Sequence, residues 1–322
     1  MFNNLRELIT SMPDEKACRD YLIKERWNGV PVCPYCGYSD KCYLIEGGKR
    51  FKCGSKACYK KFSVTIGTIF EASNIPLTKW LMAIYITSSH KKGISSYQLG
   101  KDIGISQKAA WFILHRIRYA FGNGNDNLIL DKEIQADETY LGGSNENRHK
   151  SKKRQDENGN DIDPKSPVMG IIETGGKVKT IAVNHPTKRH AIDFIENSTV
   201  KGITLVTDSA PIYHKIGKKY NHVILNHSIG EYKINGFHTN SMENYWSVLK
   251  RGIYGIYHQV SQKHLQAYCD EFSYRFNSRK MKDCDRFAVS ISKIEGRLTY
   301  KTLISKPEYL TGGKDIEPMM EE

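Results

Sequence analysis

The sequence predicts an α+β protein of several domains, and three observations support this. The N-terminal region contains two pairs of cysteines, the next segment has helical periodicity, and from about residue 129 short apolar strands alternate with helical segments. A chain of 322 residues exceeds one average domain. We therefore expect domains at 1–70, 71–125 and 126–285, followed by a C-terminal tail over 286–322.

The composition is that of a folded, basic protein. Hydrophobic residues make up 39% and aromatic residues 11% of the chain, which are values of globular domains. No apolar run approaches the roughly 18 residues that span a bilayer, and the N-terminus lacks the apolar core of a signal peptide. We expect a soluble, cytoplasmic protein with no membrane partner. The net charge of +13 favours a polyanion such as nucleic acid, although some proteins of this charge are merely soluble.

The cysteine pairs predict a metal site. Four cysteines form a C-x2-C and a C-x4-C motif with sixteen residues between them: Cys33, Cys36, Cys53 and Cys58. The stretch between the pairs reads as a hairpin with Gly47 and Gly48 at its turn. Four thiolates leave no open coordination position, so this pattern suits a structural Zn²⁺ in a zinc ribbon. Cys42, which lies between the pairs, is the alternative ligand.

The segment after the cysteines predicts helices. Thr78 can cap a first helix, a short second helix then breaks at Gly104, and Ser106 can cap a third. A tight glycine turn between two helices is typical of a helix-turn-helix unit, but a plain helical hairpin has the same pattern. Arg116 and Arg118, near the end of the third helix, are candidate DNA contacts.

The second half of the chain predicts a mixed sheet. The expected order is a strand ending at Asp137, strands over 168–174 and 177–183, a helix over 190–199, a strand over 202–210, a helix over 212–220, a strand over 222–227, and helices over 240–252 and 262–280. Three antiparallel strands followed by α/β crossovers are the layout of a ribonuclease H-like domain.

A charged loop interrupts this domain. Residues 144–167 contain almost no apolar side chains and include the run RHKSKKR. Lys152, Lys153 and Arg154 in that run are candidate phosphate contacts, and a solvated linker is the equally good alternative.

Three acidic residues fall at the ends of predicted elements. Asp137 ends the first strand, Asp208 ends the fourth, and Glu243 begins the helix after the fifth. Loops converge at the strand ends of such a sheet, where carboxylates repel one another unless cations lie between them. This pattern suits two Mg²⁺ (or Mn²⁺) ions acting on a phosphodiester. For Glu243 the alternative is a capping box with Asn240 as N-cap.

Several motifs resemble insertion-sequence transposases of the DDE type. They are ADETYLGG, TDSA and HTNSMENYWSVLKRG, together with FSVTIGTIF after the cysteines, and they keep the family's order over about residues 10–280. The subgroup resembled has an N-terminal zinc ribbon and an ISXO-type catalytic domain. The resemblance implies that Asp137, Asp208 and Glu243 bind the catalytic metals. It also implies that Lys250, seven residues after the glutamate, contacts the DNA end.

The same resemblance implies a function. The N-terminal domains would bind the element's terminal inverted repeats. The catalytic domain would cut at the ends and transfer their 3′-OH strands into target DNA, as a homo-oligomer at a prokaryotic nucleoid. Some relatives have Asn at the third catalytic position, and Asn240 and Asn244 lie close by; the spacing to Lys250 favours Glu243. His238, Asn240 and Arg251 are candidate DNA contacts, or local caps. The alternatives are a catalytically inactive zinc-ribbon regulator and a ribonuclease H-like nuclease or resolvase.

Overall fold

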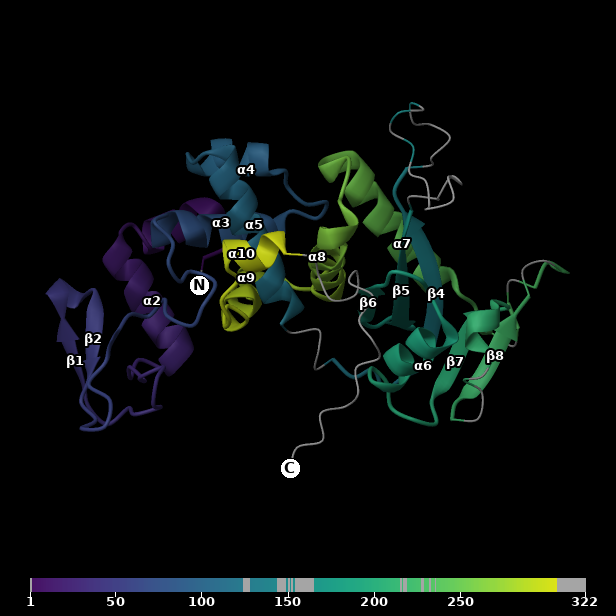
Figure 1. Ribbon diagram of the computed structural model, residues 1–322, viewed down its shortest axis with the longest axis horizontal. Coiled ribbons are helices and arrows are strands. Elements are labelled where there is room, and N and C mark those ends of the chain that lie inside the picture. The colour runs from purple at the N-terminus through teal and green to yellow at the C-terminus, as the bar shows by residue number, and fades with distance from the viewer. Residues whose placement is uncertain are drawn as a thin grey trace. The chain divides into compact units, whose positions relative to one another are not determined.

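The chain folds into two compact units (Figure 1). The first consists of Met1–Gly124 with Ser278–Ile304, and the second lies within Asn125–Asn277. The computed structural model describes residues 2–123, 128–143, 149, 151, 153, 165–214, 216, 219–226, 229–231, 233–234 and 236–305. Within these residues, no helix is both long enough and apolar enough to cross a membrane.

The first unit is mainly helical. Its helices are α1 (Leu5–Ser11), α2 (Glu15–Trp27), α3 (Leu77–Ser89), α4 (Ser96–Ile103), α5 (Gln107–Gly122), α9 (Asp283–Ser292) and α10 (Tyr300–Ile304). Helix α9 packs against α3, where the rings of Phe287 and Tyr85 lie 6.1 Å apart. Phe287 and Ile291 are buried. The sequence analysis assigns residues 283–304 partly to the catalytic domain and partly to a tail. In the structure they contribute helices to the first unit.

Helices α4 and α5 form the predicted helix–turn–helix arrangement. Gly104 ends α4 in the left-handed region at φ 65°, where a side chain would be strained. The Ser106 hydroxyl accepts the N–H of Ala109 and caps α5. The expected cap at Thr78 is wrong. Helix α3 begins at Leu77, two residues earlier than a cap at Thr78 implies, and the Thr78 N–H donates to Glu15 at 3.3 Å.

The cysteine segment forms a small antiparallel sheet in the first unit. Its strands, in the order β1-β2-β3, are β1 (Cys42–Ile45), β2 (Arg50–Cys53) and β3 (Lys61–Phe62). The predicted hairpin turn at Gly47 and Gly48 joins β1 to β2. Phe51 and Phe62 pack edge-on against Trp27 of α2, with ring centroids 6.1 and 5.9 Å from it. Aromatic packing therefore anchors the sheet to α2.

The second unit contains the predicted mixed sheet. Its strands are β4 (Ile134–Leu141), β5 (Ser166–Glu173), β6 (Val178–Ala182), β7 (Thr204–Asp208) and β8 (Asn221–Leu225), in the order β6-β5-β4-β7-β8. Strand β5 is antiparallel to both neighbours, whereas β4, β7 and β8 are parallel. This confirms the ribonuclease H-like layout. Strand β4 continues past its expected end at Asp137, because residues 138–141 pair with β5.

Helices cover both faces of this sheet. Helix α6 (Lys188–Glu196) packs on one face with Ile134 and Ala136 of β4. Helices α7 (Asn240–Gly252) and α8 (Leu265–Asn277) pack on the other. A 3₁₀ turn at Pro211–Tyr213 stands where the sequence predicts a helix over 212–220, of which residues 215, 217 and 218 lie outside the described part. Because side chains alternate along β4, its odd-numbered residues before Leu141 face α7.

Candidate functional site

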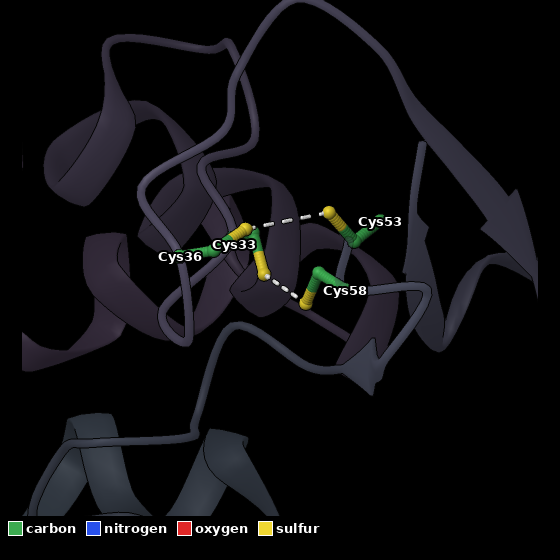
Figure 2. Close-up of side chains that lie close together, drawn as sticks. All are labelled: Cys33, Cys36, Cys53 and Cys58. Carbon is green, nitrogen blue, oxygen red and sulfur yellow. Dashed lines mark hydrogen bonds between the residues drawn. The ribbon is translucent and has the colours of Figure 1, made fainter. Parts of the chain in front are cut away.

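The four predicted cysteines lie together in the first unit (Figure 2). The sulfurs of Cys33 and Cys58 are 3.8 Å apart, those of Cys36 and Cys53 are 3.6 Å apart, and all four lie within 4.8 Å of one another. A tetrahedral zinc with Zn–S bonds of about 2.3 Å places its sulfurs about 3.8 Å apart. The cluster therefore fits a structural Zn²⁺. Cys42, the alternative ligand, lies outside the group.

Asp137 lies on β4 where the strand meets α7. Its Oδ1 accepts the N–H of Glu138 at 2.8 Å, and its Oδ2 accepts the indole N–H of Trp246 at 2.9 Å. The pKa of Asp137 is raised to about 7, mainly by burial; the two hydrogen bonds lower it, and the charges of Glu138 and Asp208 add to the rise. A nearby cation would stabilise the ionised form of this buried carboxyl group.

A glycine makes room for the contact between Trp246 and Asp137. Gly170 on β5 pairs directly with Asp137. A Cβ atom at Gly170 would lie 2.4 Å from the Met242 side chain and 2.7 Å from the indole ring of Trp246. Only glycine lets the indole lie this close to β5, and this position brings its N–H to the carboxylate.

A buried glutamine fixes the start of α7. The Oε1 of Gln135 on β4 accepts the N–H groups of Ser241 at 3.0 Å and Met242 at 3.2 Å. This contact replaces a local cap, because Thr239 is the N-cap residue and makes no side-chain cap. The alternative for Glu243, a capping box with Asn240 as N-cap, is therefore wrong.

Two further acidic residues lie beside Asp137. Asp208 ends β7 next to β4, and its Oδ1 accepts the N–H of Ala210 at 3.0 Å. Glu138 accepts a 2.9 Å hydrogen bond from the buried Tyr213 hydroxyl. Burial and the charge of Asp208 raise the pKa of Glu138. Sequence reasoning missed Glu138, although it adjoins Asp137 in the motif ADET.

Helix α7 carries the other predicted catalytic residues. Glu243 is exposed in the first turn, where its Oε1 accepts a 3.3 Å hydrogen bond from the Thr239 hydroxyl. Trp246 follows Glu243 by three residues, and Lys250 follows Trp246 by four. All three residues therefore lie along one side of the helix. Among the described residues, Asp137, Asp208 and Glu243 do not form a group whose ligand atoms lie within 4.8 Å of one another.

The structure contradicts two of the predicted DNA contacts. Arg116 and Arg118 are 4% and 1% exposed, because both point into the packed interior around α5. The Arg116 guanidinium donates to the backbone oxygens of Ile69, Glu71 and Leu298 at 2.8 to 3.1 Å. It holds segments of the first unit together, so neither arginine is available to DNA.

The other predicted DNA contacts have varied surroundings. Asn240 and Arg251 are exposed, and Lys153 is half-buried. The Nδ1 of His238 lies 3.5 Å from the amide nitrogen of Gln135. Lys152 and Arg154 lie outside the described residues.

The contact between Trp246 and Asp137 gives a testable prediction. Trp246→Phe keeps a packed ring but removes the N–H that stabilises the carboxylate. The pKa of Asp137 should therefore rise from about 7 by roughly one to two pH units. NMR titration of the carboxyl carbon without added metal measures this shift. Tyr245→Phe is the matched control, because that hydroxyl contacts Ser273 and not Asp137; equal shifts in both variants would contradict the assignment.

Comparison with known proteins finds two matching families. Residues 13–61 match the transposase zinc-ribbon domain, and residues 129–277 match the ISXO2-like transposase domain. The first match spans the cysteine cluster, and the second spans the mixed sheet with Asp137, Asp208 and Glu243. A Halobacterium salinarum protein described as an uncharacterized protein in transposable element ISH50 is 23% identical over 281 residues, covering 83% of this chain and 92% of the relative.

Proposed function

This chain belongs to the insertion-sequence transposases with an N-terminal zinc ribbon, and we propose that it cuts DNA at its element's ends and joins them to target DNA. The supporting observation is the pair Asp137 and Asp208 on adjacent parallel strands, beside the helix that carries Glu243. Each freed 3′-OH would attack a target phosphodiester directly, so no covalent protein intermediate is needed.

The carboxylates fit a divalent cation of the Mg²⁺ or Mn²⁺ type. They offer the oxygen ligands that such ions prefer, and because burial raises the pKa of Asp137, a nearby cation would stabilise its carboxylate. Asp137 and Asp208 would hold the metal from the sheet, and Glu243 would complete the ligand set from α7. Bound Mg²⁺ supplies activation of the attacking oxygen and charge stabilisation of the leaving oxygen.

Basic and polar residues near α7 would position the DNA end. Lys250 lies on the same side of the helix as Glu243 and would contact a phosphate. Arg251, Asn240 and His238 would contact the flanking strand, and the charged loop with Lys152, Lys153 and Arg154 would add phosphate contacts. Two ends must be paired before joining, so the active form would be a homo-oligomer on DNA.

Substitution of the third carboxylate tests this proposal. Glu243→Gln should lower strand joining at a labelled element end by at least about 100-fold in Mg²⁺, because an amide is a weaker metal ligand than a carboxylate. Asn244→Ala is the matched control, since the neighbouring exposed side chain should tolerate the change. Normal joining by Glu243→Gln, or equal loss in both variants, would contradict the role of Glu243. Hydrolysis without joining in the wild type would instead indicate a nuclease.

A further inference from the structure

The cysteine segment carries a large share of the protein's positive charge. Residues 41–61 include seven lysines and arginines and one glutamate, which gives +6 of the total +13. Such a concentration on a short folded segment is the electrostatic signature of a polyanion-binding surface.

Three of these charges, on Arg50, Lys52 and Lys61, lie on one side of the β1-β2-β3 sheet. Along β2, Phe51 and Cys53 are buried while Arg50 and Lys52 are exposed. Tyr43 on β1 and Lys61 on β3 pair with Lys52 from either side, so they lie on the exposed side with it. With the adjoining Lys41 and Tyr59, we call this surface the outer ribbon face: Lys41, Tyr43, Arg50, Lys52, Tyr59 and Lys61.

Two tyrosines on the outer ribbon face are paired with lysines. The Lys41 ammonium lies 5.2 Å from the ring centroid of Tyr43, and that of Lys52 lies 5.6 Å from Tyr59. Tyr43 and Tyr59 are 48% and 52% exposed, so half of each side chain remains open to a ligand.

One acidic residue lies at the edge of this face. The Glu46 carboxylate lies 3.5 Å from Nε of Arg50 and 3.4 Å from Nζ of Lys61, so it neutralises part of their charge. Within the described part of the chain, Lys41 and Lys52 form no such ion pair, and each ammonium lies beside an exposed tyrosine ring. The strongest positive potential is therefore expected next to the tyrosines.

From this arrangement we propose that the outer ribbon face binds a single strand of DNA. Lysines would contact its phosphates, and Tyr43 and Tyr59 would stack on its unpaired bases. A duplex keeps its bases stacked inside, so exposed tyrosine rings favour a strand whose bases are open. The inference rests on the proposed function in one respect: the single strand would come from an opened element end. Binding of the strand itself needs no catalysis.

Binding of a fluorescein-labelled thymidine 20-mer to the full-length, zinc-loaded protein tests this inference. In buffer without added Mg²⁺, Tyr43→Leu/Tyr59→Leu should weaken binding by about ten- to a hundredfold, because stacking contributes much of the affinity. Binding to a hairpin duplex of equal charge should change little. Tyr97→Leu is the matched control, since Tyr97 is an exposed tyrosine beside Lys101 on α4.

Unchanged zinc content and unchanged tryptophan emission, to which Trp27 beside the ribbon contributes, would show that the double variant is folded. Wild-type affinity of the folded double variant for the single strand would overturn the proposal, as would equal weakening on the duplex. Lys41→Gln/Lys52→Gln should lower the salt dependence of single-strand binding by about 1.4 in log–log slope; an unchanged slope would also count against it. Single-strand binding without any strand joining would leave this inference standing and contradict the proposed function.

Discussion

Cys53→Ser is expected to abolish zinc binding and unfold the ribbon. Cys53 is fully buried, and its sulfur lies 3.6 Å from that of Cys36 in the cluster. The ribbon's own apolar core is small, so metal binding must supply much of its folding free energy, about 10–16 kcal/mol in comparable zinc peptides. Zinc content, measured by metal release with a thiol reagent, should fall from one equivalent towards none. Trp27 fluorescence should shift, because that ring packs on Phe51 and Phe62.

Cys42→Ser provides the matched control for this experiment. Cys42 lies on β1 directly opposite Cys53 but outside the cluster. Its replacement should leave the zinc content and the Trp27 signal as in the wild type. Full zinc content in Cys53→Ser, or zinc loss in Cys42→Ser, would show that the ligand set is wrong.

Asp137→Asn is expected to reduce strand joining by about a thousandfold or more, since it removes a charged ligand that an amide cannot replace. Asp137 is the candidate carboxylate with the most detailed structural support, because the Trp246 indole donates to it and Gly170, its partner on β5, leaves room for that indole. Quantifying joined product in Mg²⁺ measures this loss. Activity above about a tenth of the wild-type level would contradict its role.

The pH dependence of the melting temperature tests whether the Asp137 carboxyl group has a raised pKa in the folded protein. It also shows whether Asp137→Asn still folds. The folded-state pKa of Asp137, about 7, lies above that of an unfolded carboxyl group near 3.8. Its contribution to stability is therefore complete below pH of about 4 and is lost as the pH rises through 7. Without added Mg²⁺, the wild-type melting temperature should fall over this range, and Asp137→Asn should show a smaller fall. Equal falls in the two proteins would contradict the raised pKa.

Local sequence signals predicted much of the fold. Cysteine spacing identified the metal cluster because four ligands close together along the chain have few other arrangements. Gly104 and Ser106 marked a turn and a cap through contacts within four residues. The succession of strands and helices along the chain followed from periodicity, and the rules of crossover connections then favoured the ribonuclease H-like layout.

Contacts between distant parts of the chain could not be predicted. Arg116 resembled a DNA contact, but it reaches carbonyls 45 to 182 residues away in sequence. Gln135 caps α7 from 106 residues away, whereas the local sequence offered only Asn240 as an alternative cap. Gly170 lies within a predicted strand, and the sequence does not show that the Trp246 indole packs against it. Each depends on a partner that only tertiary packing supplies.

We propose metal-dependent joining of DNA ends by the ribonuclease H-like unit. The most direct measurement is strand transfer on a labelled oligonucleotide that carries the element's end, with Mg²⁺ and without added divalent ion, for the wild type and Asp208→Asn. We expect joined product only from the wild type with Mg²⁺. Equal product from Asp208→Asn would contradict the catalytic assignment, and no product from the wild type despite intact end binding would indicate a DNA-binding regulator.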